Sequence, residues 1–259
     1  NMVREGDWMP AYYGETAGSC ALDRCMARAK ELMDWEHKFP SRDMGNGKVR
    51  GVGVAMSMQG SAIAGVDVGS ATIKLSEDGT YNLIIGAADM CTGCDTILAQ
   101  MAAECMDCGV EDVAVFGADT DASPYDSGSY ASSTTYITGK AVEQACAELK
   151  QKICAIAAGM LGCAPEEIVF EGRQVRRAST GETVTLEQIG YKSQVSNNIA
   201  AEATASHSSP VSPPPYMVGM VEIELDKETG QVTVLDYMAV VDCGIPINPA
   251  LARIQTEGG

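Results

Sequence analysis

The sequence of 259 residues predicts an α+β fold. Apolar side chains recur with a helical period in some segments and alternate with polar ones in others. These helical and extended segments do not alternate strictly along the chain, as they would in a doubly wound parallel sheet. Apolar residues make up 46% of the sequence and charged residues 20%, which is typical of a globular protein with one large or two small cores.

The predicted helices begin near residues that can cap a helix. Ser19 precedes a segment that places Leu22, Cys25 and Ala29 on one face, and polar residues 92–95 precede the next helix. The run of hydroxyl residues that ends at Ser133 precedes a long third helix. We expect helices over residues 19–38, 95–108, 133–160 and 185–191.

Alternating or β-branched segments predict the strands. Asp78-Gly79 is typical of a tight hairpin turn between two of them, and residues 226–230 turn between the last two. We expect strands over residues 49–58, 71–76, 81–87, 113–116, 168–176, 217–225 and 231–241. Irregular structure is expected over residues 1–18, 39–49, 119–132, 193–215 and 242–259, the last with a helical turn after Pro249.

The polar segment 193–215 is the one plausible internal boundary in the sequence. We therefore expect three consecutive parts: an N-terminal helix and linker (1–48), a first α+β part (49–192), and a loop with a strand pair that forms a truncated second part (193–259).

The charge of the chain excludes some partners. A net charge of −17 repels nucleic acid and anionic membranes, so neither is expected as a partner. No apolar run approaches the roughly 18 residues that span a bilayer, and the first residues lack the pattern of a signal peptide. Ten cysteines without such a signal favour reduced thiols and a cytoplasmic location.

Three segments rich in glycine and hydroxyl residues are candidate binding loops: residues 86–96, 125–135 and 248–259. Two of them precede predicted helices, whose first N–H groups favour an anion. Because no Lys or Arg lies between Lys74 and Lys140, backbone amides and hydroxyls would have to hold that anion, which excludes a Walker phosphate loop. The candidate hydroxyls are those of Ser129, Ser132, Thr134 and Thr135. Each loop taken alone is also explained by ordinary capping and turns.

Two stretches of the chain resemble the cofactor domain of the xanthine dehydrogenase and aldehyde oxidase family. One runs from Gly-Val-Gly-Val-Ala-Met at residues 51–56 to Lys140, and the other from Pro-Pro-Pro-Tyr at 213–216 to Asp-Cys-Gly-Ile-Pro-Ile-Asn-Pro at 242–249. The resemblance covers most of residues 19–259. It implies a fold like that family's molybdenum-cofactor-binding domain.

The resemblance also implies an activity. Members of the family hydroxylate a purine, another N-heterocycle or an aldehyde, with water as the oxygen source. Their cofactor is molybdopterin with molybdenum, with or without a cytosine nucleotide. Electrons leave through iron–sulfur and FAD subunits or domains, which are therefore the expected partners.

By motif, the resemblance assigns six cofactor-binding positions. Thr92 and Gly93 lie where the family's Gly-Gln-Gly or Gly-Thr-Gly loop touches the pterin. A second group holds the pterin and its phosphate: Ala131, Ser132 and Thr135. Gln255 lies in the Gln-x-Glu-Gly element, whose glutamine contacts the cofactor. No protein ligand to molybdenum is expected.

No catalytic residue is expected in this chain. The family's base glutamate lies in a Gly-x-Gly-Glu loop well after the Gln-x-Glu-Gly element, and residues 1–259 do not contain that loop. We therefore expect the chain by itself to be inactive and free of cofactor.

Two other classes stay open. Cys91-x-x-Cys94 and Cys105-x-x-Cys108 have the spacing of a zinc or iron–sulfur module without catalysis. Against this, Cys105 and Cys108 fall in a predicted helix, where cysteine usually packs as a small apolar residue. The other class is a non-catalytic assembly module, whose exposed apolar surface other segments would cover.

Overall fold

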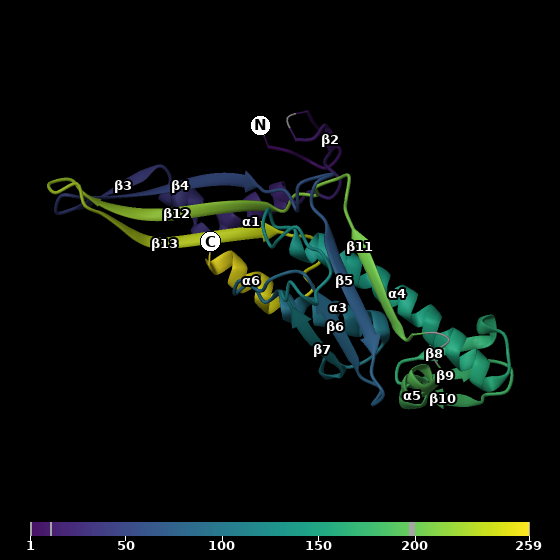
Figure 1. The fold of residues 1–259 in the computed structure, drawn as a ribbon. Helices are drawn as coiled ribbons and strands as arrows, with labels where there is room; N and C mark the ends of the chain where they lie inside the picture. Colours follow the sequence, from purple (N-terminus) through teal and green to yellow (C-terminus); the bar gives the residue numbers. More distant parts are fainter. Residues whose placement is uncertain (1, 11, 197–199, 259) are drawn as a thin grey trace. The chain divides into compact units, whose positions relative to one another are not determined.

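The computed structural model describes residues 2–10, 12–196 and 200–258. The chain forms two compact units (Figure 1). Unit 1 comprises residues 1–61 and 211–259, and unit 2 comprises residues 62–210. Helices mix with largely antiparallel sheets in both units, which confirms the expected α+β class.

This division differs from the three consecutive parts expected from the sequence, which were residues 1–48, 49–192 and 193–259. Residues 49–61 belong to unit 1 because strand β4 (Lys48–Met58) pairs along its whole length with β12 (Tyr216–Asp226). An alternating pattern shows that a segment is a strand but does not show which distant strand it pairs with. The second boundary, at residue 210, lies inside the polar segment 193–215.

Unit 1 is built on a four-stranded antiparallel sheet in the order β13-β12-β4-β3. Helix α1 (Leu22–Met33) packs against β12 and β13 (Val232–Asp242). Its apolar face and the facing strand residues form the core of this unit: Cys20, Leu22, Cys25, Ala29, Met33, Tyr216, Val218 and Met220. Unit 1 also contains β1 (Trp8–Met9), β2 (Glu15–Thr16), α2 (Trp35–Lys38) and α6 (Pro249–Gly258).

Three expectations about residues 19–49 are wrong. The expected helix 19–38 begins at Leu22 and is interrupted at Asp34, whose φ of 55° is left-handed. Ser19 does not cap it: the residue before α1 is Ala21, whose N–H donates to the Asp242 carboxylate at 2.8 Å. The expected linker 39–49 contains the strand β3 (Ser41–Gly45), an edge strand too polar to show an alternating pattern.

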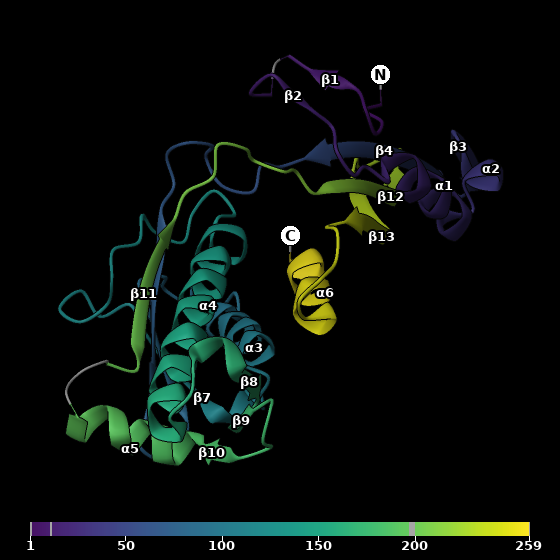
Figure 2. The same cartoon turned by 90° about the vertical axis from the view of Figure 1, so that its right-hand side faces the viewer.

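Unit 2 is built on a second four-stranded sheet, in the order β11-β5-β6-β7. Strands β5 (Gly69–Leu75), β6 (Tyr81–Ile85) and β11 (Glu202–His207) are antiparallel neighbours, and β7 (Val113–Gly117) joins β6 in parallel. Helices α3 (Cys94–Met106) and α4 (Thr134–Leu161) pack together beside this sheet, and α4 runs along β5 and β11 (Figure 2).

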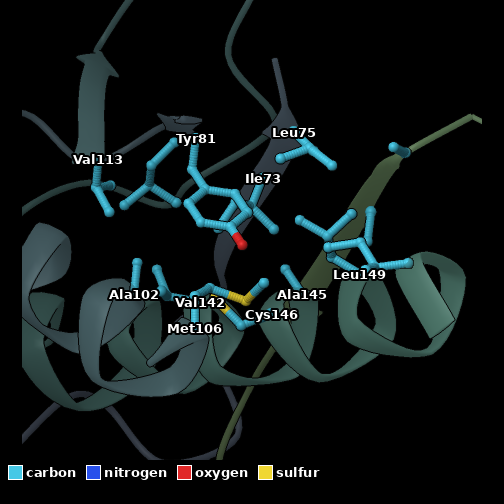
Figure 3. Close-up of a cluster of buried hydrophobic side chains, with 14 of the residues drawn as sticks. Ile73, Leu75, Tyr81, Ala102, Met106, Val113, Val142, Ala145, Cys146 and Leu149 are labelled. Atoms are coloured by element: carbon cyan, nitrogen blue, oxygen red, sulfur yellow. The ribbon is translucent and has the colours of Figure 1, made fainter. Parts of the chain in front are cut away.

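The core of unit 2 lies between the sheet and these two helices (Figure 3). Tyr81 and Ile73 from the sheet meet Met106 of α3 and Val142 of α4, and all four are fully buried. Burial of such side chains stabilises a fold by about 1.5–3 kcal/mol each. α4 is the longest helix, and none of the helices in the described part of the chain is long and apolar enough to span a membrane.

Strand β11 corrects a further expectation. Residues 193–215 read as a loop, yet residues 202–207 pair in full with β5, while residues 197–199 lie outside the described part. Alanine is the inward residue at 203, so the alternation carries little apolar signal. Hydroxyl pairs reinforce the register, with Thr72 to Thr204 at 2.7 Å and Ser70 to Ser206 at 2.7 Å.

A small three-stranded sheet completes unit 2. It consists of β8 (Ile168–Glu171), β9 (Gln174–Arg177) and β10 (Thr183–Thr185), and is followed by α5 (Leu186–Ser196). The expected single strand 168–176 is therefore a hairpin. It turns at Gly172, whose φ is 62° and whose position leaves no room for a Cβ beside the Asp107 carbonyl. Single 3-10 turns occur at Val110–Asp112 and Pro165–Glu167.

Candidate functional site

Unit 2 brings two of the three glycine- and hydroxyl-rich segments together. The Ser129 Oγ donates to the Ala88 carbonyl at 2.8 Å and accepts from the Ala88 N–H at 3.1 Å. Close by, a Cβ on Gly86 would lie 2.5 Å from that of Asp126. The segment before α3 and the segment before α4 are thus joined directly, and the two helix starts form one candidate site.

The start of α3 is already occupied by a carboxylate of the chain itself. Asp89 accepts hydrogen bonds from the N–H groups of Thr92 at 2.9 Å, Gly93 at 3.1 Å and Asp95 at 3.3 Å. Burial raises the pKa of Asp89, but these N–H donors outweigh it and hold the pKa below its usual value. Gly93, with φ of 74°, is the residue that precedes the helix. A bound anion would have to displace Asp89 from these amides.

A second acidic group lies beside Asp89. Burial, and then the charge of Asp89, raise the pKa of Asp95. Burial raises the pKa of the Cys94 thiol to about 11. Ligand atoms of these three residues lie within 4.8 Å of one another, the closest approach to a metal-ligand set in the described residues. Since Asp89 is engaged by main-chain donors, the group serves first to hold the loop.

The start of α4 has a different character. Ala131 and Ser132 are consecutive non-glycine residues with left-handed φ values of 51° and 58°. Such strain costs about 1 kcal/mol or more per residue and gathers at functional sites. Ser133, which precedes α4, makes no side-chain cap bond to the helix, and no acidic residue lies in its first turn. Its first N–H groups therefore keep the capacity to bind an anion.

Hydroxyl groups surround this helix start. Ser132 lies just before the helix and Thr135 in its first turn, and both are exposed, while Thr134 is half-buried. Ser129 does not share this role, because both of its hydrogen bonds go to Ala88. No Lys or Arg occurs between Lys74 and Lys140, so these two segments themselves offer only main-chain and hydroxyl donors.

A neighbouring turn supports the strained pair. The Ala62 N–H donates to the Ala131 carbonyl at 2.8 Å. Asp67, only 1% exposed, accepts the Ile63 N–H at 2.8 Å, which closes the turn that carries Ala62. The N–H of Ser127 donates to Val68 at 2.9 Å and links the same two segments once more. The conformation of Ala131 is thus held from outside its own loop.

Five of the six predicted binding residues lie at these two helix starts: Thr92, Gly93, Ala131, Ser132 and Thr135. Gln255 is an exposed residue of α6 in unit 1, so its place beside the others stays a prediction. Asp89, which accepts the main-chain N–H groups at the start of α3, is not among the residues predicted from the sequence. The pattern Asp-x-x-Thr-Gly before a helix, typical of a side chain that caps main-chain N–H groups, was the available signal.

The cysteine-module alternative is wrong. Cys94 and Cys105 both lie in α3, eleven residues apart, which separates them by about 16 Å along the helix axis. The Cys105 thiol instead contacts Cys146 of α4. Across the described residues, no group of three or more potential metal ligands contains more than one cysteine.

Two joined segments at helix starts that offer hydroxyl and main-chain donors are suited to an anionic organic cofactor. The chain belongs to the molybdopterin cofactor-binding domain family, whose model matches residues 28–259. This confirms the resemblance noted from the sequence motifs.

Named relatives agree. The chain is 34% identical over 244 residues to the probable hypoxanthine oxidase XdhD of Escherichia coli K12, covering 94% of the chain and 25% of that protein. It is 31% identical over 269 residues to the putative xanthine dehydrogenase molybdenum-binding subunit XdhA of the same organism, covering 100% of the chain and 35% of that protein. The chain thus spans about a quarter to a third of the length of these relatives.

Solved structures share the fold. Quinoline 2-oxidoreductase from Pseudomonas putida 86 matches with a TM-score of 0.81 at 22% identity, over 95% of this chain and 34% of that chain. Reconstituted CO dehydrogenase from Oligotropha carboxidovorans matches with a TM-score of 0.79 at 22% identity, over 95% of this chain and 33% of that chain.

Proposed function

We propose that this chain is the molybdopterin-binding part of a xanthine dehydrogenase-type molybdenum hydroxylase. The family match and the names of the relatives support the class of enzyme. The observation that carries the binding role is the start of α4, where the strained pair Ala131 and Ser132 leads into an uncapped helix.

The donors present fit a phosphorylated pterin. A phosphate accepts hydrogen bonds from helix N–H groups and hydroxyls without needing a lysine or arginine. In this proposal the main chain at Ala131 and the hydroxyls of Ser132 and Thr135 hold the phosphate-bearing part of the cofactor. When bound, the cofactor supplies a molybdenum centre for hydroxylation with water as the oxygen source.

At the other helix start, the proposed contacts are limited by Asp89. Because Asp89 accepts the N–H groups of Thr92 and Gly93, these two amides are not available to the pterin, and the turn would contact it through its exposed surface around Thr92. Gln255 would add a contact from α6. These residues bind and orient the cofactor, and none is assigned a proton-transfer role.

The relatives suggest the wider reaction and its partners. The nicotine 6-hydroxylase large subunit of Paenarthrobacter nicotinovorans is 27% identical and, with the purine enzymes above, favours a purine or another N-heterocycle as substrate. An aldehyde stays the third candidate class from the sequence motifs. We propose iron–sulfur and FAD subunits or domains as partners, a cytoplasmic location, and molybdopterin with or without a cytosine nucleotide.

The test is the molybdenum and pterin content of the complete enzyme that contains this chain, purified from a cofactor-producing bacterium. The double variant S132A/T135A removes both hydroxyls, and we expect it to lose at least about tenfold in bound molybdenum, as for two charge-assisted hydrogen bonds. The control S179A/T180A removes the same groups from an exposed turn of unit 2 and should keep full content.

Two outcomes would contradict the proposal: a wild-type enzyme without molybdenum, or a fully loaded S132A/T135A variant. A second consequence concerns the chain alone. At a quarter to a third of the relatives' length and without an assigned base, it should not turn over substrate. Measured hydroxylation of a purine or aldehyde by the 259-residue chain would refute this.

A further inference from the structure

We propose that Asp89 is a positioning residue that pre-forms the start of α3 for an uncharged part of the cofactor. The inference rests on the proposed function above. In this role, Asp89 orders the Thr92-Gly93 turn and keeps anions away from it, so that the phosphate-bearing part is directed to the start of α4.

The ordering follows from the contacts of Asp89. One oxygen, Oδ1, accepts the N–H groups of Thr92 and Gly93, and the other, Oδ2, accepts the N–H of Asp95. The Thr92 side chain also hydrogen-bonds to this carboxylate. These bonds fix a turn in which Cys91, with φ of 64°, and Gly93, with φ of 74°, are both left-handed. Within the described residues, Asp89 is the acceptor that the N–H groups of Thr92 and Gly93 have, so its removal would leave both amides without this hydrogen bond.

Exclusion of anions follows from charge. The amides that would otherwise receive a phosphate at α3 are satisfied by Asp89. The Asp95 carboxylate lies within 4.8 Å of that of Asp89, and no Lys or Arg between residues 75 and 139 offsets them. A second anion at this place would meet repulsion without new donors.

The two helix starts therefore differ in a defined way. At the start of α3, Asp89 accepts hydrogen bonds from the main-chain N–H groups. At the start of α4, the preceding residue Ser133 makes no side-chain hydrogen bond to the first N–H groups of the helix. Ser129 joins the two segments through Ala88, the residue directly before Asp89. Asp89 thus sets the orientation in which a ligand with one anionic end can lie across the joined loops.

The test compares D89A with the conservative variant D89E and with the control D78A. Asp78 also accepts a main-chain N–H, that of Thr80 at 3.0 Å, in a hairpin turn of the same unit. The first readout is amide hydrogen exchange in the 259-residue chain. We expect D89A to accelerate exchange at residues 92–95 at least about tenfold, while D78A accelerates it at Thr80 alone.

The second readout is molybdenum and pterin per chain in the complete enzyme. We expect the molybdenum and pterin content of D89A to fall at least about fivefold, that of D89E to recover more than half of this loss, and that of D78A to match the wild type. The melting temperatures of the chain variants should lie within about 3 °C of one another. A fully loaded D89A enzyme, or failure of D89E to recover content, would overturn the inference alone. A wild-type enzyme without molybdenum would overturn the proposed function and this inference with it.

Discussion

The hydroxyl of Ser129 bonds to both main-chain groups of Ala88, donating to its carbonyl at 2.8 Å and accepting from its N–H at 3.1 Å. In an antiparallel β-sheet, a residue makes the same pair of hydrogen bonds to the main chain of the residue opposite it. Here the single hydroxyl of Ser129 makes both bonds in place of a neighbouring strand. Two segments that are remote in sequence are thereby held in a fixed register beside the candidate site.

Ser129→Ala should weaken this connection. The substitution leaves two partly buried main-chain groups of Ala88 without their partner, and we expect a loss of about 1–2 kcal/mol in the free energy of unfolding. Urea denaturation of the chain measures it. Ser179→Ala, at an exposed hydroxyl of the same unit, should change stability by less than about 0.5 kcal/mol. Equal stability of the two variants would show that the Ser129 bonds contribute nothing.

Substitution of glycine by alanine should have opposite effects on stability at Gly86 and at Gly159. A Cβ on Gly86 would overlap the Pro124 carbonyl and lie 2.5 Å from the Asp126 Cβ, so Gly86→Ala should destabilise the chain by about 1–3 kcal/mol. Gly159 lies exposed within α4 with nothing within 4 Å of such a Cβ, so Gly159→Ala should stabilise it by about 0.5–1 kcal/mol. Thermal unfolding of both variants tests the pair, and shifts of the same sign would contradict the packing described.

Acid should weaken unit 1 through Glu222. This carboxylate is 6% exposed and pairs with Lys38 at 2.7 Å and with Arg42. The hydrogen bond from Lys38, and then that from Arg42, lower its pKa below the ordinary 4.5 despite burial. A depressed folded-state pKa gives stability that is complete above the unfolded value and is lost as the pH falls through the folded value.

Glu222→Gln should therefore cost about 1–3 kcal/mol at pH 7, a range reduced from that of fully buried pairs because Lys38 and Arg42 are 22% and 34% exposed. The difference from the wild type should shrink as the pH falls below 4.5 in denaturant titrations. Glu228→Gln, at an exposed carboxylate of the same unit, provides the control. A gap that stays constant down to the acid transition would refute the assignment.

Cys105 should be more reactive than the two other thiols in and just after α3, Cys94 and Cys108. The hydrogen bond with the Cys146 thiol lowers the pKa of Cys105, whereas burial raises the pKa of both Cys94 and Cys108 to about 11. Since the thiolate is the nucleophile, iodoacetamide at pH 7 should label Cys105 well before those two, as peptide mass spectrometry can show.

Cys146→Ala removes that hydrogen bond and should slow labelling of Cys105 about tenfold. Cys163→Ala, beyond the end of α4, should leave the rate unchanged. If Cys105 reacts no faster than Cys108 in the unaltered chain, the thiol pair does not form in solution.

The long periodic elements of the fold follow from the sequence. Helix α4 and the strands β4, β12 and β13 occur within one or two residues of their predicted bounds, because each carries a strong apolar period. Strands β3 and β11 were not predicted. Both are edge strands whose side chains are polar or small, and it is the partner strand that determines their conformation.

The candidate site was predictable in its residue types and not in its hydrogen bonds. Hydroxyl runs before helices pointed to the start of α4, and the structure places Ser132 and Thr135 there. The occupation of α3 by Asp89 was not foreseen, because an aspartate near a helix start serves equally as a cap, a ligand or a solvated charge. Which role it takes depends on the path of the loop around Thr92 and Gly93.

The pairing of β4 with β12 bears on how the chain folds during synthesis. The two strands that must meet are separated by the whole of residues 62–210, which form a unit of their own. During synthesis, all of unit 2 is made before β12, so unit 2 can fold while β4 still lacks this partner strand. Until β12 emerges, one edge of β4 has no partner strand, and an unpaired strand edge of this kind is open to aggregation or to binding by a chaperone.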